Sequence, residues 1–147
     1  MNEERAYELA AQALQAAVRE QWETATDAVQ AIGDECGPEG VEYACRAWCD
    51  ALIVRYQAAT GLPYPAGEPV RPVWQDAVTG TLKDADEVGT RSRWAGRLLA
   101  ARAALDYDAY KALIASVPPD PQVVGEHVGT LLTTVATTLR DLMAGAS

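Results

Sequence analysis

One stretch near the start of the chain decides the fold: residues 3–32 read EERAYELAAQALQAAVREQWETATDAVQAI. It contains neither Gly nor Pro, the two residues that most often interrupt a helix. Its apolar residues recur at steps of three and four, as they do on one face of a helix. The stripe consists of Tyr7, Ala11, Leu14, Val18, Trp22, Ala25, Val29 and Ile32. This pattern predicts an amphipathic helix whose apolar face follows the stripe.

The length of this stretch leaves two alternatives. Thirty helical residues would measure about 45 Å at 1.5 Å per residue. A globule of this chain length has a radius of gyration of only about 15 Å. The stretch is therefore either one long helix or two helices that are split near Arg19–Glu23. Because no Gly or Pro marks a split, we expect one long helix over residues 3–32.

A second helix is expected directly after the first. Gly33 predicts the end of the first helix, and Pro38 suits the first turn of the next. Gly61 predicts the end of this second helix. Because the connection is short, the two helices should be antiparallel neighbours. The apolar stripe of the second helix is Val41, Cys45, Trp48, Leu52, Tyr56 and Ala59.

Residues 61–72 are rich in proline, which lacks an amide donor and fixes φ, so we expect a crossover loop there. A third helix is expected from about Val73, carrying Trp74, Ala77, Val78, Leu82 and Ala85, although Gly80 and Thr81 weaken it. Gly89 and Thr90 then indicate a stop followed by an N-cap.

The remaining sequence predicts three more helices. The first covers about residues 91–105, and the second extends from a cap at Asp106 or Asp108 to about Val117. Asp120 and Pro121 form a cap and first-turn pair for the last helix. Its stripe is Val124, Val128, Leu131, Val135, Leu139 and Leu142. The predicted fold is an all-α, single-domain bundle over residues 1–147, with five to six helices.

The charge of the chain limits its partners. Among 147 residues, 21 acidic and 12 basic side chains give a formal net charge of −9. Nucleic acids and anionic membranes both require a positive surface, so neither is an expected partner. A protein partner with a basic patch suits this charge better.

The cysteines and the N-terminus indicate a compartment. The chain has three cysteines, Cys36, Cys45 and Cys49, and its first residues lack the basic and apolar regions of a secretory signal. An odd number of thiols without such a signal favours the reducing cytoplasm. No apolar run approaches the roughly 18 residues that a membrane span requires.

Sequence motifs for catalysis or cofactor binding are not found. The three cysteines and the single His127 could in principle bind zinc, but Cys45 and Cys49 lie four residues apart on a helix rather than in a knuckle. No serine lies in a nucleophile elbow, and there is no phosphate-binding glycine motif. We therefore expect no enzyme activity, no cofactor and no metal.

The aromatic residues are the most informative candidates for contacts. The chain has four Trp, six Tyr and no Phe. Most of the Trp should fill the core between Ala-rich helices, but one or two could form an exposed anchor or line a pocket. The candidate partner or ligand contacts are Trp22, Trp48, Tyr64, Trp74, Arg93, Trp94 and Arg97.

Two functions are compatible with this sequence. The first is a non-enzymatic cytoplasmic bundle that binds another protein, including a second copy of itself as a homodimer. The alternative is a small-molecule-binding or sensor bundle, in which Trp side chains frame a pocket and Arg93 or Arg97 contacts an anionic group.

Overall fold

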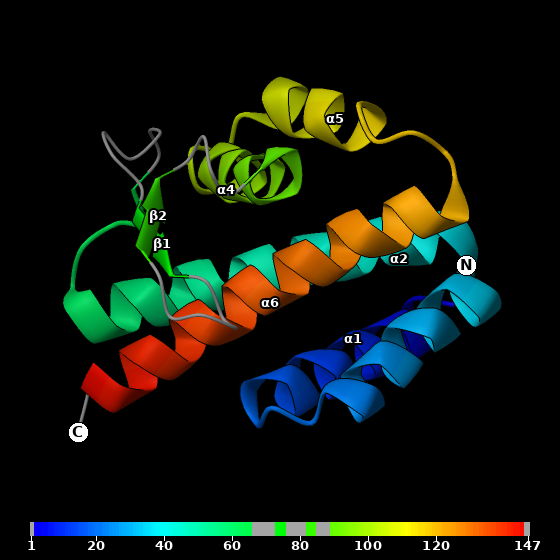
Figure 1. Cartoon of the computed structure of the whole chain (residues 1–147), viewed down its shortest axis with the longest axis horizontal. Coiled ribbons are helices and arrows are strands. Elements are labelled where there is room, and N and C mark those ends of the chain that lie inside the picture. Colours follow the sequence, from blue (N-terminus) through cyan, green and yellow to red (C-terminus); the bar gives the residue numbers. More distant parts are fainter. Residues whose placement is uncertain (1, 66–72, 76–81, 85–88, 146–147) are drawn as a thin grey trace. The chain divides into compact units, whose positions relative to one another are not determined.

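The computed structural model describes residues 2–65, 73–75, 82–84 and 89–145, with only the backbone described at 73–75 and 82–84. The described chain is almost entirely helical, so the all-α class is confirmed (Figure 1). Its helices are α1 (Glu3–Val18), α2 (Trp22–Thr60), α4 (Thr90–Ala103), α5 (Tyr107–Ala115) and α6 (Pro121–Gly145).

The chain divides into two compact units, and each is described by itself. One consists of Met1–Tyr64 and Leu131–Ser147, and the other of Pro65–Thr130. That residues 1–147 form a single domain stays a prediction.

The N-terminal helix is confirmed over 16 residues, but the expected single helix over residues 3–32 is wrong. The chain turns at Arg19–Gln21, the place of the alternative split. Glu20 takes the left-handed conformation with a φ of 61°. The Glu20 and Gln21 amides donate to the Ala17 and Ala16 carbonyls at 3.0 and 2.8 Å. These two hydrogen bonds close the C-terminal end of α1 in a pattern whose left-handed residue is usually a glycine.

Helix α2 consists of two helical segments joined at Gly37, whose φ of 68° and ψ of −166° are not helical. Pro38 opens the second segment as expected, because the first turn of a helix does not need its amide. The expected stop at Gly33 is wrong, since Gly33 lies inside the first segment. Gly61, with a φ of 70°, ends α2 as predicted.

The first segment of α2 returns along α1 (Figure 1). The Arg5 guanidinium donates to both carboxylate oxygens of Glu35, at 2.9 and 3.1 Å. This pair joins the start of α1 to the end of that segment, while residues 19–21 join their other ends. The antiparallel arrangement is therefore confirmed, with the second helix beginning earlier than predicted.

The expected third helix is wrong. Residues Val73–Gln75 (β1) and Leu82–Asp84 (β2) pair as antiparallel strands, with Trp74 opposite Lys83. Val and Trp favour strands, and Gly80 and Thr81 disfavour a continuous helix between the two segments. The crossover predicted over 61–72 is described only to residue 65, and Ala77, Val78 and Ala85 lie outside the described residues.

In the unit Pro65–Thr130, the caps predicted at Asp106 and Asp120 are confirmed. The Asp106 carboxylate accepts from the Ala109 amide at 3.1 Å, and Asp120 accepts from the Gln122 amide at 2.9 Å. The N-cap predicted at Thr90 is wrong, because Gly89 precedes α4 as its cap and Thr90 is the first helical residue. Leu105 takes a φ of 57° in the turn between α4 and α5. Helix α4 is tied to the first part of α6 by an Arg91–Glu126 ion pair at 3.2 Å.

Candidate functional site

Helix α1 carries two parallel apolar stripes, and only one of them enters the core. The first, the alanine stripe, consists of Ala6, Ala10, Ala13 and Ala17, which are at most 2% exposed. The second, the α1 stripe, lies one residue further on and consists of Tyr7, Ala11, Leu14 and Val18. Tyr7 is 61% exposed, Ala11 is exposed, and Leu14 and Val18 are half-buried. The side that the sequence predicted as the apolar face is therefore largely open to solvent.

Close packing explains why the alanine stripe faces inward. A side chain that ends at Cβ lets two helix backbones approach closely. The indole Nε1 of Trp48 reaches the backbone of α1 and donates to the Ala10 carbonyl oxygen at 2.9 Å. Trp48 is 1% exposed, and its bulk fills the space beside the alanines. Turning α1 to bury Tyr7 and Leu14 would lose this contact and the close approach.

Charged side chains lie at both ends of the α1 stripe. Glu3 and Glu4, in the first turn of α1, precede Tyr7 by four and three residues and so lie one helical turn from it. Arg19, the exposed C-cap residue, directly follows Val18. The stripe is therefore acidic at its N-terminal end and carries a cation at its C-terminal end.

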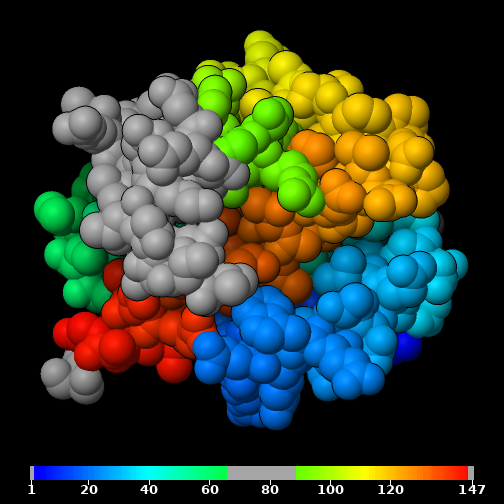
Figure 2. Space-filling view, viewed as in Figure 1, coloured from blue at the N-terminus to red at the C-terminus, as the bar shows by residue number. Residues whose placement is uncertain are grey.

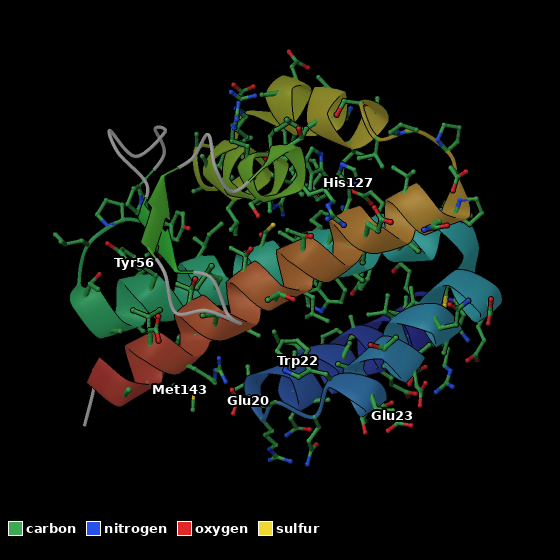
Figure 3. The ribbon with its side chains drawn as sticks, in the orientation of Figure 1. Glu20, Trp22, Glu23, Tyr56, His127 and Met143 are labelled. Atoms are coloured by element: carbon green, nitrogen blue, oxygen red, sulfur yellow. The ribbon has the colours of Figure 1, made fainter. Side chains whose placement is uncertain are left out.

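A second exposed aromatic residue lies at the corner between α1 and α2. Trp22, the first residue of α2, is 40% exposed. Glu20 of this corner forms an ion pair with Arg140 of α6. Figure 3 labels Glu20, Trp22 and the exposed Glu23 around the corner, and Figure 2 shows the blue atoms of this region at the surface. Among the predicted contact tryptophans whose side chains are described, Trp22 is exposed, whereas Trp48 and Trp94 are buried.

Two of the predicted contact residues are interior. Trp48 packs on α1 as described above. Trp94, 6% exposed, donates from Nε1 to the Leu113 carbonyl oxygen at 2.8 Å and meets the His127 ring edge to face, with 5.2 Å between ring centroids. Both indoles are large side chains with a satisfied N–H, which is typical of core tryptophans.

The remaining predicted contacts are spread over both units. Tyr64 lies edge to face on Tyr56, with 5.1 Å between ring centroids, and burial raises the pKa of its phenol. Arg93 and Arg97 are exposed on α4, whereas Trp94 between them in sequence is buried. Trp74 lies in β1, and its side chain is outside the described residues. Within its unit, Trp94 therefore shares no exposed surface with the two arginines.

Sequence reasoning missed the exposure of Tyr7. The signal was present, because Ala6, Ala10, Ala13 and Ala17 repeat the steps of the α1 stripe. The stripe with the larger apolar side chains was predicted as the buried face, although alanine allows a closer contact between two helices. An exposed pair at the α4–α5 turn, Leu105 and Tyr107, was missed as well.

The described residues hold no group of three or more His, Cys, Asp or Glu side chains placed to bind a metal ion. All three cysteines are buried. Burial, and after it the nearby Glu42 carboxylate, raises the pKa of the Cys45 thiol from 9.0 to about 12. A thiol with such a pKa is protonated near neutral pH and is a poor nucleophile.

Comparison of the chain with protein-family models, with curated proteins and with solved structures finds no match in any of the three. Among the helices of the described residues, none is long and apolar enough to cross a membrane.

Proposed function

We propose that this chain is a non-enzymatic cytoplasmic protein that acts by binding another protein through the α1 stripe. The observation that carries the proposal is the exposure of Tyr7 and Ala11, with Leu14 and Val18 half-buried, beside a fully buried alanine stripe. Apolar residues at i, i+4, i+7 and i+11 are the anchors that helices use when they dock into a partner.

The chemistry of these side chains supports the proposal. Tyr and Leu bury a large apolar area, and Tyr adds a hydroxyl that can form a hydrogen bond at the edge of an interface. A Tyr side chain that is 61% exposed contributes little to the fold. Contact with a partner would account for a tyrosine at this position, whereas packing within the chain does not.

The surrounding charge favours a partner that is basic near its apolar contacts. Glu3 and Glu4 lie one turn from Tyr7, so a basic group of the partner should meet the N-terminal end of α1. Opposite charges at the rim of an interface mainly accelerate association and exclude wrong partners. The reducing cytoplasm is the compartment that suits three buried free thiols.

Affinity capture with two matched variants tests this proposal. Tyr7→Ser and Val54→Ser each remove one exposed apolar side chain, 61% and 65% exposed, from different helices. Proteins retained by the wild-type chain should be lost with Tyr7→Ser and kept with Val54→Ser. Equal retention by both variants would refute a docking role for the α1 stripe.

The alternative of a Trp-lined ligand site has weaker support. Trp48 and Trp94 are buried, and their N–H groups are bonded to backbone carbonyls. A thermal-shift screen of anionic metabolites would nevertheless reveal such a site. A stabilisation that is lost in both Arg93→Gln and Arg97→Gln would favour the ligand-binding function over the protein-binding one.

A further inference from the structure

The spacing of the α1 stripe reads the same in both directions along the helix. Tyr7, Ala11, Leu14 and Val18 are separated by four, three and four residues. An interface with two-fold symmetry requires a surface that is complementary to itself, so that residue i of one copy contacts residue j of the other and the reverse. Two antiparallel copies of α1 centred between residues 12 and 13 meet this requirement.

The side chains in this arrangement match in size. Leu14 of one copy lies opposite Ala11 of the other, and this large-against-small contact occurs twice. Tyr7 lies opposite Val18, also twice, at the two ends of the contact. Interdigitation of large and small side chains is what allows two helices to pack closely.

The charges at the ends of the stripe also match. An antiparallel pair brings the N-terminal end of one α1, with Glu3 and Glu4, alongside the C-terminal end of the other, where Arg19 and the Glu20–Arg140 ion pair lie. Acidic groups near a helix N-terminus and a cation near a C-terminus each complement the helix dipole as well. A parallel pair would instead place Glu3 and Glu4 against their own copies.

We infer that the occupant of the α1 stripe is a second copy of this chain, bound through antiparallel α1 helices. The inference rests on the proposed function for the identity of the surface and adds the partner. One helical stripe per copy covers less than the roughly 800 Å² per partner of a standard stable interface. The dimer should therefore be weak, with a dissociation constant in the micromolar range or above.

Disulfide crosslinking between two variants that each add one cysteine to the three native ones tests the geometry. Tyr7→Cys and Val18→Cys place thiols at positions that lie opposite each other only in the antiparallel pair. In that pair each position is about 16 Å along the helix axis from its own copy, at 1.5 Å per residue. The native cysteines are buried, and the unmodified chain serves as the control for their background.

Mild oxidation of the mixed variants at about 100 µM should yield a crosslinked dimer, while each variant alone and the unmodified chain should yield at least about tenfold less. Efficient crosslinking of Tyr7→Cys to itself would overturn the antiparallel geometry. An absence of crosslinked dimer in the mixture, with both variants folded by circular dichroism, would overturn the inference.

Sedimentation equilibrium of uncrosslinked protein gives a second measurement. Ala11→Glu places a charge at the centre of the proposed interface, and Gln12→Glu places the same charge on an exposed position one residue away, outside the stripe. Wild type and Gln12→Glu should dimerise over about 10–500 µM, and Ala11→Glu should stay monomeric. A monomeric wild-type chain would overturn the inference, whereas the proposed function would still stand if Tyr7→Ser abolished capture of a different protein.

Discussion

At the scale of single residues, Trp48 and Trp22 differ in how much of each side chain the fold uses. Trp48 is 1% exposed and donates to the Ala10 carbonyl, whereas Trp22 is 40% exposed. Trp48→Phe removes a buried hydrogen bond and leaves a small void, so we expect a loss of about 2–3 kcal/mol in the free energy of unfolding. Trp22→Phe should change it by less than about 0.5 kcal/mol. Urea denaturation of both variants checks this, and equal losses would contradict the assignment.

Leu105 occupies a backbone conformation that suits glycine. Its φ is 57°, its side chain is 63% exposed, and its amide and that of Asp106 close the end of α4. Leu105→Gly should stabilise the chain by up to about 1 kcal/mol, because a left-handed residue with a Cβ costs about 1–2 kcal/mol. Ala104→Gly, one residue earlier in a right-handed helical conformation, should destabilise by about 0.5–1 kcal/mol. Thermal denaturation of the two variants should show shifts of opposite sign.

The Cys45 thiol makes stability depend on pH in the alkaline range. Its pKa rises from 9.0 to about 12 on folding, mainly through burial. Above pH 9 the unfolded chain loses this proton while the folded chain keeps it, so the free energy of unfolding should fall as pH rises from 9 towards 12. The fall should be less steep in Cys45→Ala, in denaturant titrations at each pH. An equal slope in both proteins would contradict the shift.

At the scale of elements, the helices that carry side-chain caps were predictable from sequence. Asp106 and Asp120 mark the starts of α5 and α6, because their carboxylates accept bonds from amides at the helix N-terminus. The corner at Glu20 was not predictable in the same way. A glutamate there takes a conformation that sequence rules reserve for glycine or asparagine, so the pattern offered no sign of the break.

The two glycines at residues 33 and 37 provide a matched test of the break in α2. Gly37 combines a φ of 68° with a ψ of −166°, a region that residues with a Cβ rarely enter, and no atom lies within 4 Å of a Cβ added there. Gly37→Ala should therefore lower the free energy of unfolding by about 1–3 kcal/mol through backbone strain alone. Gly33→Ala, at an open helical position, should raise it by about 0.5–1 kcal/mol. Urea denaturation that gives both variants the same sign would contradict the kink.

At the scale of the whole molecule, composition and periodicity were enough for the all-α class but not for the choice of buried face. Both stripes of α1 have the same period, and only the packing against α2 distinguishes them. The antiparallel strands Val73–Gln75 and Leu82–Asp84 were not predicted, for a related reason. Its strands are too short to show alternation, and apolar residues in a short segment fit a helix as well as a strand.

The candidate contact surface could likewise be predicted only in part from the sequence. The sequence identified Trp22 among seven possible contacts, and it included Tyr7 only as part of the expected apolar face. Exposure is a property of the packed molecule, because it depends on which helices cover a residue that is distant in sequence. Charge was the part of the surface that could be read directly, since Glu3, Glu4 and Arg19 lie beside the stripe on the same helix.

The most direct test of the central claim, that the α1 stripe is a protein-docking surface, is site-specific photo-crosslinking in living cells. A photoreactive phenylalanine analogue replaces Tyr7 in one protein and Val54, which is similarly exposed on α2, in another. We predict a discrete crosslinked product from position 7, of the mass of two chains or of this chain with one other protein, that position 54 does not give. No product at position 7, or the same products at both positions, would contradict the claim.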